Sequence, residues 1–203
     1  MHTMALAAHS YSPLSGALNA HPIKFLPPTL DASPNPYLCT MSVHQQVKRV
    51  TTHTLQQMKR DNAPISMLTA YDFTMTRLLD QAGIDVLLVG VSASNVMAGH
   101  ETTLPITLDH MIYHASSVVR GAQRALVVVD LPFGSYQANS SEALRSAIRI
   151  MKETGAHGVK LEGGKEIGTQ IKAIRNAGIP CVGHLGMLPQ HILEEGKYRI
   201  KGR

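Results

Sequence analysis

ALVVVDLPFGSY, residues Ala125 to Tyr136, is the stretch that decides the fold class of this chain. An unbroken apolar run bounded by turn residues is typical of a strand buried on both faces, as in a parallel sheet covered by helices. Asp130 stands where this strand should end, and an unpaired buried charge is costly, so a cap, an ion pair or a ligand must explain it. Because ligands bind at the carboxyl ends of parallel strands, we interpret Asp130 as a candidate site residue.

The same pattern recurs on both sides of this stretch. Further strands are predicted at residues 65–70, 86–90, 158–161 and 179–183, and helices at 43–58, 73–82, 108–120, 140–153 and 165–177. Residues 91–105 are predicted to form a long loop, and Ser140, Ser141 and Glu142 to cap the helix that they open. Alternating strands and helices predict an α/β fold of the TIM (β/α)8-barrel type. Since a full barrel has eight strands in about 250 residues, we expect a truncated barrel of about five βα units.

Composition narrows the class of protein. The chain has 203 residues, no Trp, three Phe and a net charge of +5, which disfavours base stacking on nucleic acid and suits a small anionic substrate. No apolar run approaches the roughly 18 residues of a membrane span. Cys39 and Cys181 lie far apart and form no CxxC, so neither a zinc site nor a disulfide framework is indicated. We therefore expect a cytoplasmic protein that binds neither nucleic acid nor membranes.

Residues 1–40 differ from the rest of the chain. Lys24 and Asp31 are their only full charges, and the segment is rich in Pro, Ser and Ala without a helical or strand period. Two interpretations stay open, a disordered tail and a mis-assigned extension in front of a true start at Met41. The folded domain is predicted to cover residues 41–203.

Polar residues are predicted to gather at the carboxyl ends of the strands, which is the active face of a barrel. They are Tyr71, Asp72, Ser92, Asp130, Lys160, Glu162 and His184. Lys160 and Glu162 alternate on one strand and so share a face, as a structural ion pair or as part of a site. His184 either contacts a ligand or is a satisfied structural histidine, and Tyr71 and Asp72 are left without a role. The remaining histidines of this region are interpreted as structural or surface residues: His100, His110, His114 and His157.

Five motifs occur in a fixed order from about residue 50 onward. They are TAYD at 69–72, GHETTLPIT at 99–107, DLPFGSY at 130–136, VKLEGG at 159–164 and GHLGMLPQ at 183–190. In these motifs the chain resembles the ketopantoate hydroxymethyltransferase family. The resemblance implies a TIM-barrel enzyme of pantothenate biosynthesis that uses Mg²⁺ and assembles as a homodecamer. It would move a hydroxymethyl group from the folate co-substrate 5,10-methylenetetrahydrofolate to the 2-oxo acid 3-methyl-2-oxobutanoate, giving 2-dehydropantoate.

The resemblance also implies roles for single residues. Asp130 would be a direct Mg²⁺ ligand at the substrate, Glu162 an acid near the metal and its waters, and Ser92 and Lys160 substrate contacts. Such chemistry requires a Lewis acid, because charge develops on the keto oxygen when the neighbouring proton leaves. Val91 stands where the family has a second aspartate ligand. The family's general-base glutamate would follow Arg203, so no catalytic residue is assigned within the chain.

Two other functions stay open at this point. The chain could be an inactive fragment or pseudogene product of this family that retains at most substrate or partner binding. Alternatively, it could be another oxo-acid barrel enzyme, such as a relative of phosphoenolpyruvate mutase or isocitrate lyase.

Overall fold

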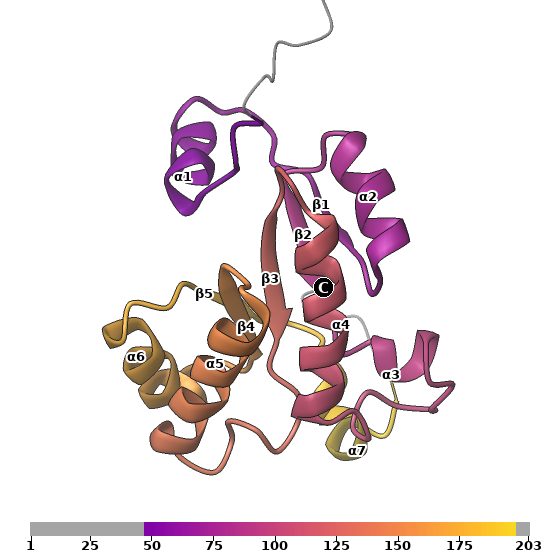
Figure 1. The fold of residues 1–203 in the computed structure, drawn as a ribbon. Coiled ribbons are helices and arrows are strands. Elements are labelled where there is room, and N and C mark those ends of the chain that lie inside the picture. Colours follow the sequence, from indigo (N-terminus) through magenta and orange to yellow (C-terminus); the bar gives the residue numbers. More distant parts are fainter. Residues whose placement is uncertain (1–46, 198–203) are drawn as a thin grey trace, which may run out of the picture. The chain divides into compact units, whose positions relative to one another are not determined.

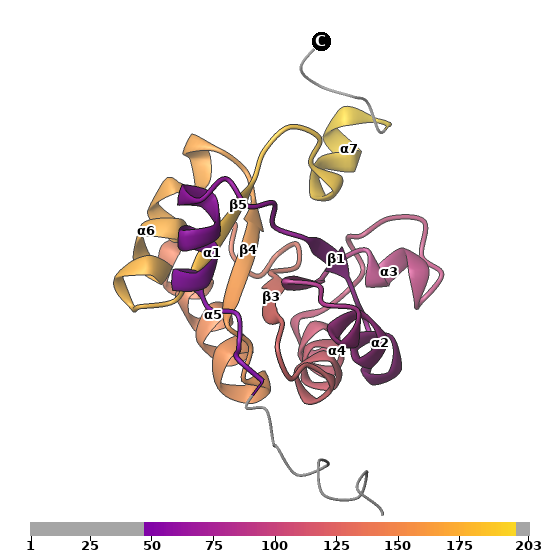
Figure 2. The same cartoon turned by 90° about the horizontal axis from the view of Figure 1, so that it is seen from above.

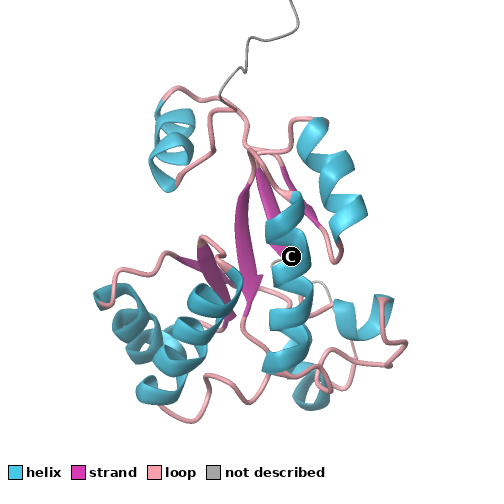
Figure 3. Cartoon of the chain, viewed as in Figure 1, coloured by secondary structure: helices cyan, strands magenta, loops and turns pink. Residues whose placement is uncertain are grey.

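The computed structural model describes residues 47–197, which belong to one compact unit spanning residues 45–203. The predicted tail at 1–40 and the first part of the predicted helix at 43–58 lie outside the described residues. In the part that is described, strands and helices alternate along the chain (Figure 3).

A single sheet forms the centre of this unit (Figure 1). Its parallel strands are β1 (Met67–Thr69), β2 (Val86–Val89), β3 (Leu126–Asp130), β4 (Gly158–Glu162) and β5 (Cys181–His184). They lie side by side in the order in which they occur in the sequence. The register pairs Asp130 with Lys160 and Glu162 with His184, so polar residues of neighbouring strands meet at the carboxyl edge. The predicted α/β class with five parallel strands is confirmed.

Helices follow the strands and cover the sheet. They are α1 (Thr52–Arg60), α2 (Phe73–Gln81), α3 (Ala93–Val96), α4 (Leu108–Gly121), α5 (Ser140–Thr154), α6 (Gly168–Asn176) and α7 (Ile192–Glu195). Two 3-10 turns, η1 (Lys165–Ile167) and η2 (Pro189–His191), precede α6 and α7. Seen from above, α2, α4, α5 and α6 follow one another along the outer side of the curved sheet (Figure 2).

Local details differ from the sequence predictions in several places. The helix predicted at 43–58 begins only at Thr52 and runs to Arg60, and residues 47–51 before it are not helical. The predicted loop at 91–105 contains the short helix α3, which small residues permit directly after β2. The cap of α5 is Asn139, whose side chain accepts the N–H of Glu142, and Ser140 is already helical. Asparagine is as good an N-cap as serine, so the sequence pattern alone could not choose between neighbouring positions.

Two apolar clusters lie on opposite faces of the sheet. The larger includes Leu87, Val127 and Val129 together with residues of the outer helices, and the smaller contains Leu126 and Val128 with Leu55 of α1 packed against it. Alternate residues of β3 therefore enter different clusters, and all five of its residues are buried. This two-sided burial explains the unbroken apolar run.

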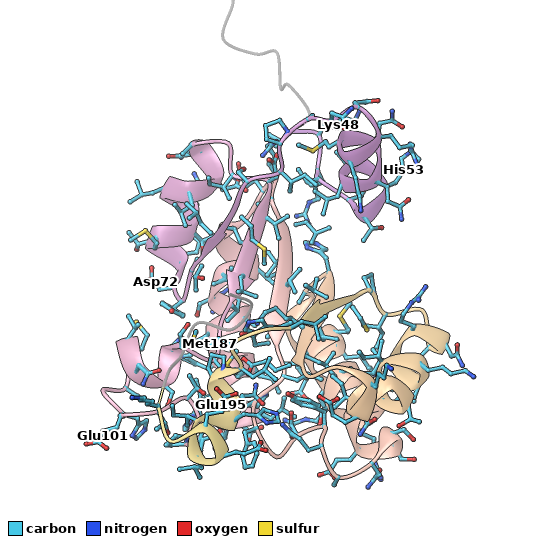
Figure 4. The ribbon with its side chains drawn as sticks, turned by 180° about the vertical axis from the view of Figure 1, so that it is seen from behind. Lys48, His53, Asp72, Glu101, Met187 and Glu195 are labelled. Atoms are coloured by element: carbon cyan, nitrogen blue, oxygen red, sulfur yellow. The ribbon has the colours of Figure 1, made fainter. Side chains whose placement is uncertain are left out.

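The amino-terminal and carboxyl edges of the sheet carry different kinds of acid. Near the amino-terminal edge, the Asp80 carboxylate accepts backbone N–H groups at Arg124 and Ala125, and Asp85 accepts from Ser66 and from the Arg124 guanidinium. The hydrogen bonds of these two carboxylates stabilise the fold, and we assign them no role in a site. Lys48, just before α1, and His53, within α1, lie at this end, whereas Glu101 and Glu195 lie at the opposite end (Figure 4). Among residues 47–197, no helix is both long and apolar enough to cross a membrane.

Candidate active site

Asp130 and Lys160 form a buried ion pair at the carboxyl edge. The Asp130 side chain is 5% exposed and that of Lys160 is 12% exposed, and the ammonium donates to Asp130 Oδ1. The second oxygen, Oδ2, accepts the backbone N–H of Val91 at 3.1 Å. Each of the two groups thus has a hydrogen-bond partner of opposite charge away from bulk water.

Ser92 is brought to this pair by the absence of a side chain at Gly90. A β-carbon on Gly90 would lie 2.9 Å from Ser92 Oγ and 3.6 Å from Asp130 Oδ2. A side chain at position 90 would therefore displace the Ser92 hydroxyl, while its contact with the Asp130 carboxylate would be an ordinary one. The hydroxyl of Tyr71 lies 2.8 Å from Ser92 Oγ and fixes it from the other side. Tyr71, to which the sequence assigned no role, thus belongs to the candidate site.

Glu162 and His184 form a second polar group on the next two strands. Glu162 is 2% exposed, and its Oε2 accepts the backbone N–H of Gln190 at 3.0 Å. His184 Nδ1 lies 3.4 Å from Glu162 Oε1 without the geometry of a hydrogen bond, and it has no other partner in the described part of the chain. A buried polar atom without a partner is unusual in a structural residue. His184 Nδ1 thus lies beside the Glu162 carboxylate, and its contact with a ligand stays a prediction.

Tyr136 and Gln190, which sequence reasoning did not single out as site residues, hold Glu162 in place. The buried Tyr136 hydroxyl lies 3.0 Å from both the Glu162 carbonyl and Gln190 Oε1, and Gln190 Nε2 donates to Leu131 O at 2.9 Å. Burial raises the pKa of the Tyr136 phenol, which keeps it a hydrogen-bond donor. Both residues close quoted motifs, DLPFGSY and GHLGMLPQ, but no local pattern predicts that the motifs touch.

This edge can recognise a small anion. Lys160 and the hydroxyls of Ser92 and Tyr71 supply donors, while Asp130 and Glu162 balance the charge and offer oxygen ligands. Asp72, by contrast, caps α2 by accepting the N–H of Met75 at 2.8 Å. It is thereby explained as a structural residue.

The oxygen atoms at this edge meet the requirements of Mg²⁺. The ion takes one or two carboxylates, keeps several waters and leaves positions for substrate oxygens. Each Asp130 oxygen retains an unused lone pair beside its one hydrogen bond, and Glu162 adds a buried carboxylate. Within residues 47–197, no three His, Cys, Asp or Glu side chains already surround one point. The residues fit a largely hydrated Mg²⁺ ion with Asp130 as its one direct protein ligand.

The fold and the site define a class of protein, a parallel (β/α)-barrel type with its polar groups at the carboxyl edge. Solved structures share the fold at low sequence identity. Phosphoenolpyruvate phosphomutase from Streptomyces platensis subsp. rosaceus aligns with a TM-score of 0.51 at 17% identity, covering 64% of this chain and 52% of that chain. A phosphonopyruvate hydrolase complex with oxalate and Mg²⁺ aligns with a TM-score of 0.52 at 12% identity, covering 70% of this chain and 53% of that chain.

Sequence comparison identifies the family within this class. The model of the ketopantoate hydroxymethyltransferase family matches residues 49–203. The 3-methyl-2-oxobutanoate hydroxymethyltransferases of Cytophaga hutchinsonii and Flavobacterium johnsoniae are each 69% identical over 77% of this chain. The chain belongs to the ketopantoate hydroxymethyltransferase family. It spans 58% and 57% of the length of these two relatives.

Proposed function

We propose that this chain carries the oxo-acid part of a ketopantoate hydroxymethyltransferase site. The reaction would transfer a hydroxymethyl group from 5,10-methylenetetrahydrofolate to 3-methyl-2-oxobutanoate and yield 2-dehydropantoate. The observation that carries the proposal is the Asp130–Lys160 pair, which lies next to Ser92 at the carboxyl edge in a chain of this family. A weakly exposed ammonium at the same edge of the sheet as two hydroxyl groups is suited to a small acid with adjacent carboxylate and keto oxygens.

Each residue has a distinct task in this proposal. Lys160 attracts an oxygen of the oxo acid, and its partner Asp130 keeps the ammonium charged and directed. Ser92, oriented by the Tyr71 hydroxyl, donates a hydrogen bond to the bound acid. The low exposure of this edge strengthens each of these interactions, because water competes less for the same groups.

Mg²⁺ is part of the proposal, with Asp130 as direct ligand and Glu162 acting on its waters. When bound, the ion would supply Lewis-acid stabilisation of the charge that develops on the keto oxygen. Glu162 is suited to its task because Gln190 and Tyr136 fix its position. None of the described residues is assigned as the general base.

A second function from a different class is favoured by one observation. Val91 contributes only its N–H to Asp130, so the site has one carboxylate at the position where the family uses two. A chain that binds the oxo acid without transferring a hydroxymethyl group would be a non-catalytic member of the family.

One set of measurements separates the two functions. Calorimetric titration of the full chain with 3-methyl-2-oxobutanoate should show binding that Lys160→Met abolishes and that Lys152→Met, an exposed lysine on α5, leaves unchanged. Nuclear magnetic resonance then follows deuterium uptake at C3 of the acid and product formation with the folate. Uptake and product support the enzyme, and binding without either supports the non-catalytic member. Absence of binding with the fold intact by circular dichroism would overturn both.

A further inference from the structure

The ring of His114 on α4 is held by a hydrogen bond of the kind that orients metal-binding histidines. Its Nδ1 lies 2.9 Å from the carbonyl oxygen of Tyr71. A carbonyl only accepts, so Nδ1 carries the hydrogen and Nε2 of the neutral ring keeps a free lone pair. Metal ligands among histidines almost always donate the other ring N–H to a carbonyl, carboxylate or water, which fixes the ring and the tautomer.

His110 lies one turn before His114 on the same helix. Residues four apart share a helix face, and two histidines at this spacing are an established pair of metal ligands. His110 Nδ1 accepts the N–H of Thr107 at 3.4 Å, while Thr107 Oγ1 accepts the N–H of His110 at 3.2 Å. The bond from the Thr107 N–H to His110 Nδ1 is long. The bond from the His110 N–H to Thr107 Oγ1 caps the helix even when the longer bond is absent. Coordination through Nε2 requires the ring hydrogen on Nδ1, so metal binding must offset the loss of this one long bond from the exposed Thr107 N–H.

Both side chains line one cavity of about 240 Å³. The same cavity is lined by His100, which is exposed in the loop after α3, and by Ser94 and Met97. Within residues 47–197 no three ligands are already gathered around one point. The two histidines of α4 would therefore hold an ion together with water molecules.

We propose that His110 and His114 bind a divalent transition-metal ion of the Zn²⁺, Ni²⁺ or Cu²⁺ type through their Nε2 atoms. Imidazole nitrogen suits these ions, whereas Mg²⁺ prefers oxygen ligands. His110 lies in the first turn of α4, where the helix dipole places partial positive charge. This charge repels a cation, so electrostatic attraction cannot hold the ion there. Direct coordination by nitrogen is thus the only source of affinity here, and it selects transition metals over Mg²⁺. This site is separate from the carboxylates of the candidate active site and does not depend on the proposed function.

The test is a calorimetric titration of the full chain with Ni²⁺ and Zn²⁺, with His110→Gln and His114→Gln as variants. Glutamine at position 110 preserves the capping box with Thr107, so that variant removes the ligand and retains the helix start. His53→Gln, an exposed histidine on α1 at the other end of the sheet, is the matched control for scattered histidines. Circular dichroism checks that each variant is folded.

The expected result is one site whose affinity falls at least about tenfold in either α4 variant. The same site should be unchanged in His53→Gln and should resist excess Mg²⁺. Equal affinity in the His110→Gln variant and the native chain would overturn the proposal. So would displacement of the ion by Mg²⁺, which would place it at the carboxylates.

Discussion

Val91 lies just after β2 and connects the apolar core to Asp130. Its side chain is 3% exposed and packs in the larger apolar cluster, while its N–H points to Asp130. It therefore supports the carboxylate from the backbone but supplies no oxygen to a cation. In the proposed Mg²⁺ site, the carboxylates would therefore come from Asp130 and Glu162.

Replacing Val91 by aspartate should make stability depend on Mg²⁺. Without metal, a second carboxylate close to Asp130 is buried without a partner, which should lower the melting temperature. With Mg²⁺ at about 100 times its dissociation constant, binding to the folded state should return about 2.7 kcal/mol. The measurement is a thermal melt of both forms in chelator and in Mg²⁺.

Val91→Asn separates charge from shape in this experiment. Asparagine has nearly the size of aspartate but carries no charge. The Val91→Asn variant should therefore be less stable than the native chain, and Mg²⁺ should raise its melting temperature little. An equal Mg²⁺ response of the asparagine and aspartate forms would mean that position 91 does not reach the metal.

At the scale of elements, Gln190 after β5 connects the loop after β3 to the end of β4. Gln190 in η2 contacts the Tyr136 hydroxyl and Leu131 O after β3, and its N–H holds Glu162 at the end of β4. Gln190→Leu should lower the free energy of unfolding by about 1–3 kcal/mol, because buried polar atoms lose their partners. Hydrogen exchange at the Glu162 amide, which donates to Tyr136, should accelerate in parallel.

The Tyr136→Phe variant completes this test. Removing the hydroxyl in the Gln190→Leu background should cost less than removing it from the native chain, because its partner is already gone. Strictly additive effects would show that the two side chains do not act together.

His157, just before β4, should make the fold sensitive to acid. Its Nδ1 accepts the N–H of Val127 at 2.9 Å, and burial together with the nearby Arg49 lowers the pKa of the imidazole. The unfolded chain, with an ordinary histidine pKa near 6.5, then takes up the proton first. Stability from this group is present above that pH and is lost as the pH falls below it toward the lowered folded pKa.

Comparison with His157→Asn measures this effect. Asparagine has an acceptor oxygen for Val127 but does not titrate, so between about pH 7.5 and about pH 5.5 the native chain should lose more thermal stability than the variant. Parallel losses in the two proteins would assign the acid sensitivity to other groups.

The elements also show what the sequence could and could not predict. Strands such as β3 were predictable because burial on both faces leaves an unbroken apolar run. The meeting of Asp130, Lys160 and Glu162 at one edge followed from parallel strand order. The contacts of Tyr71 with Ser92 and of Tyr136 with Gln190 were not predictable, because they join loops 21 and 54 residues apart. No local pattern of residues encodes such a pairing.

At the scale of the whole sheet, both edges are open within residues 47–197. β1 and β5 are the outer strands, and every residue of β1 is exposed, with Leu68 at 47%. An apolar groove of about 340 Å³ crosses the inner face and reaches Met67 on β1 and Val182 on β5. Exposed parallel edges next to apolar surface are prone to pair with other chains.

The purified chain should therefore associate with itself. Leu68→Lys places a charge on the β1 edge, the device by which natural edge strands avoid pairing, and should shift the chain toward monomer. Analytical ultracentrifugation over a range of concentrations provides the measurement. A native chain that stays monomeric at all of them would contradict this prediction.

The same edges should accept strands from the part of a relative that this chain does not match. The Cytophaga hutchinsonii protein is matched over only 58% of its length, so its remaining part can be produced as a separate polypeptide. If that part completes the sheet, co-production should give a complex with one copy of each and should suppress the self-association. Hydrogen exchange should slow at the amides of β1 and β5 and change little in β3, which already has a neighbour on both sides. Leu68→Lys should weaken the complex as it weakens self-association, since both use the β1 edge. A complex that protects only the outer helices would show that the partner docks on the unit without extending its sheet.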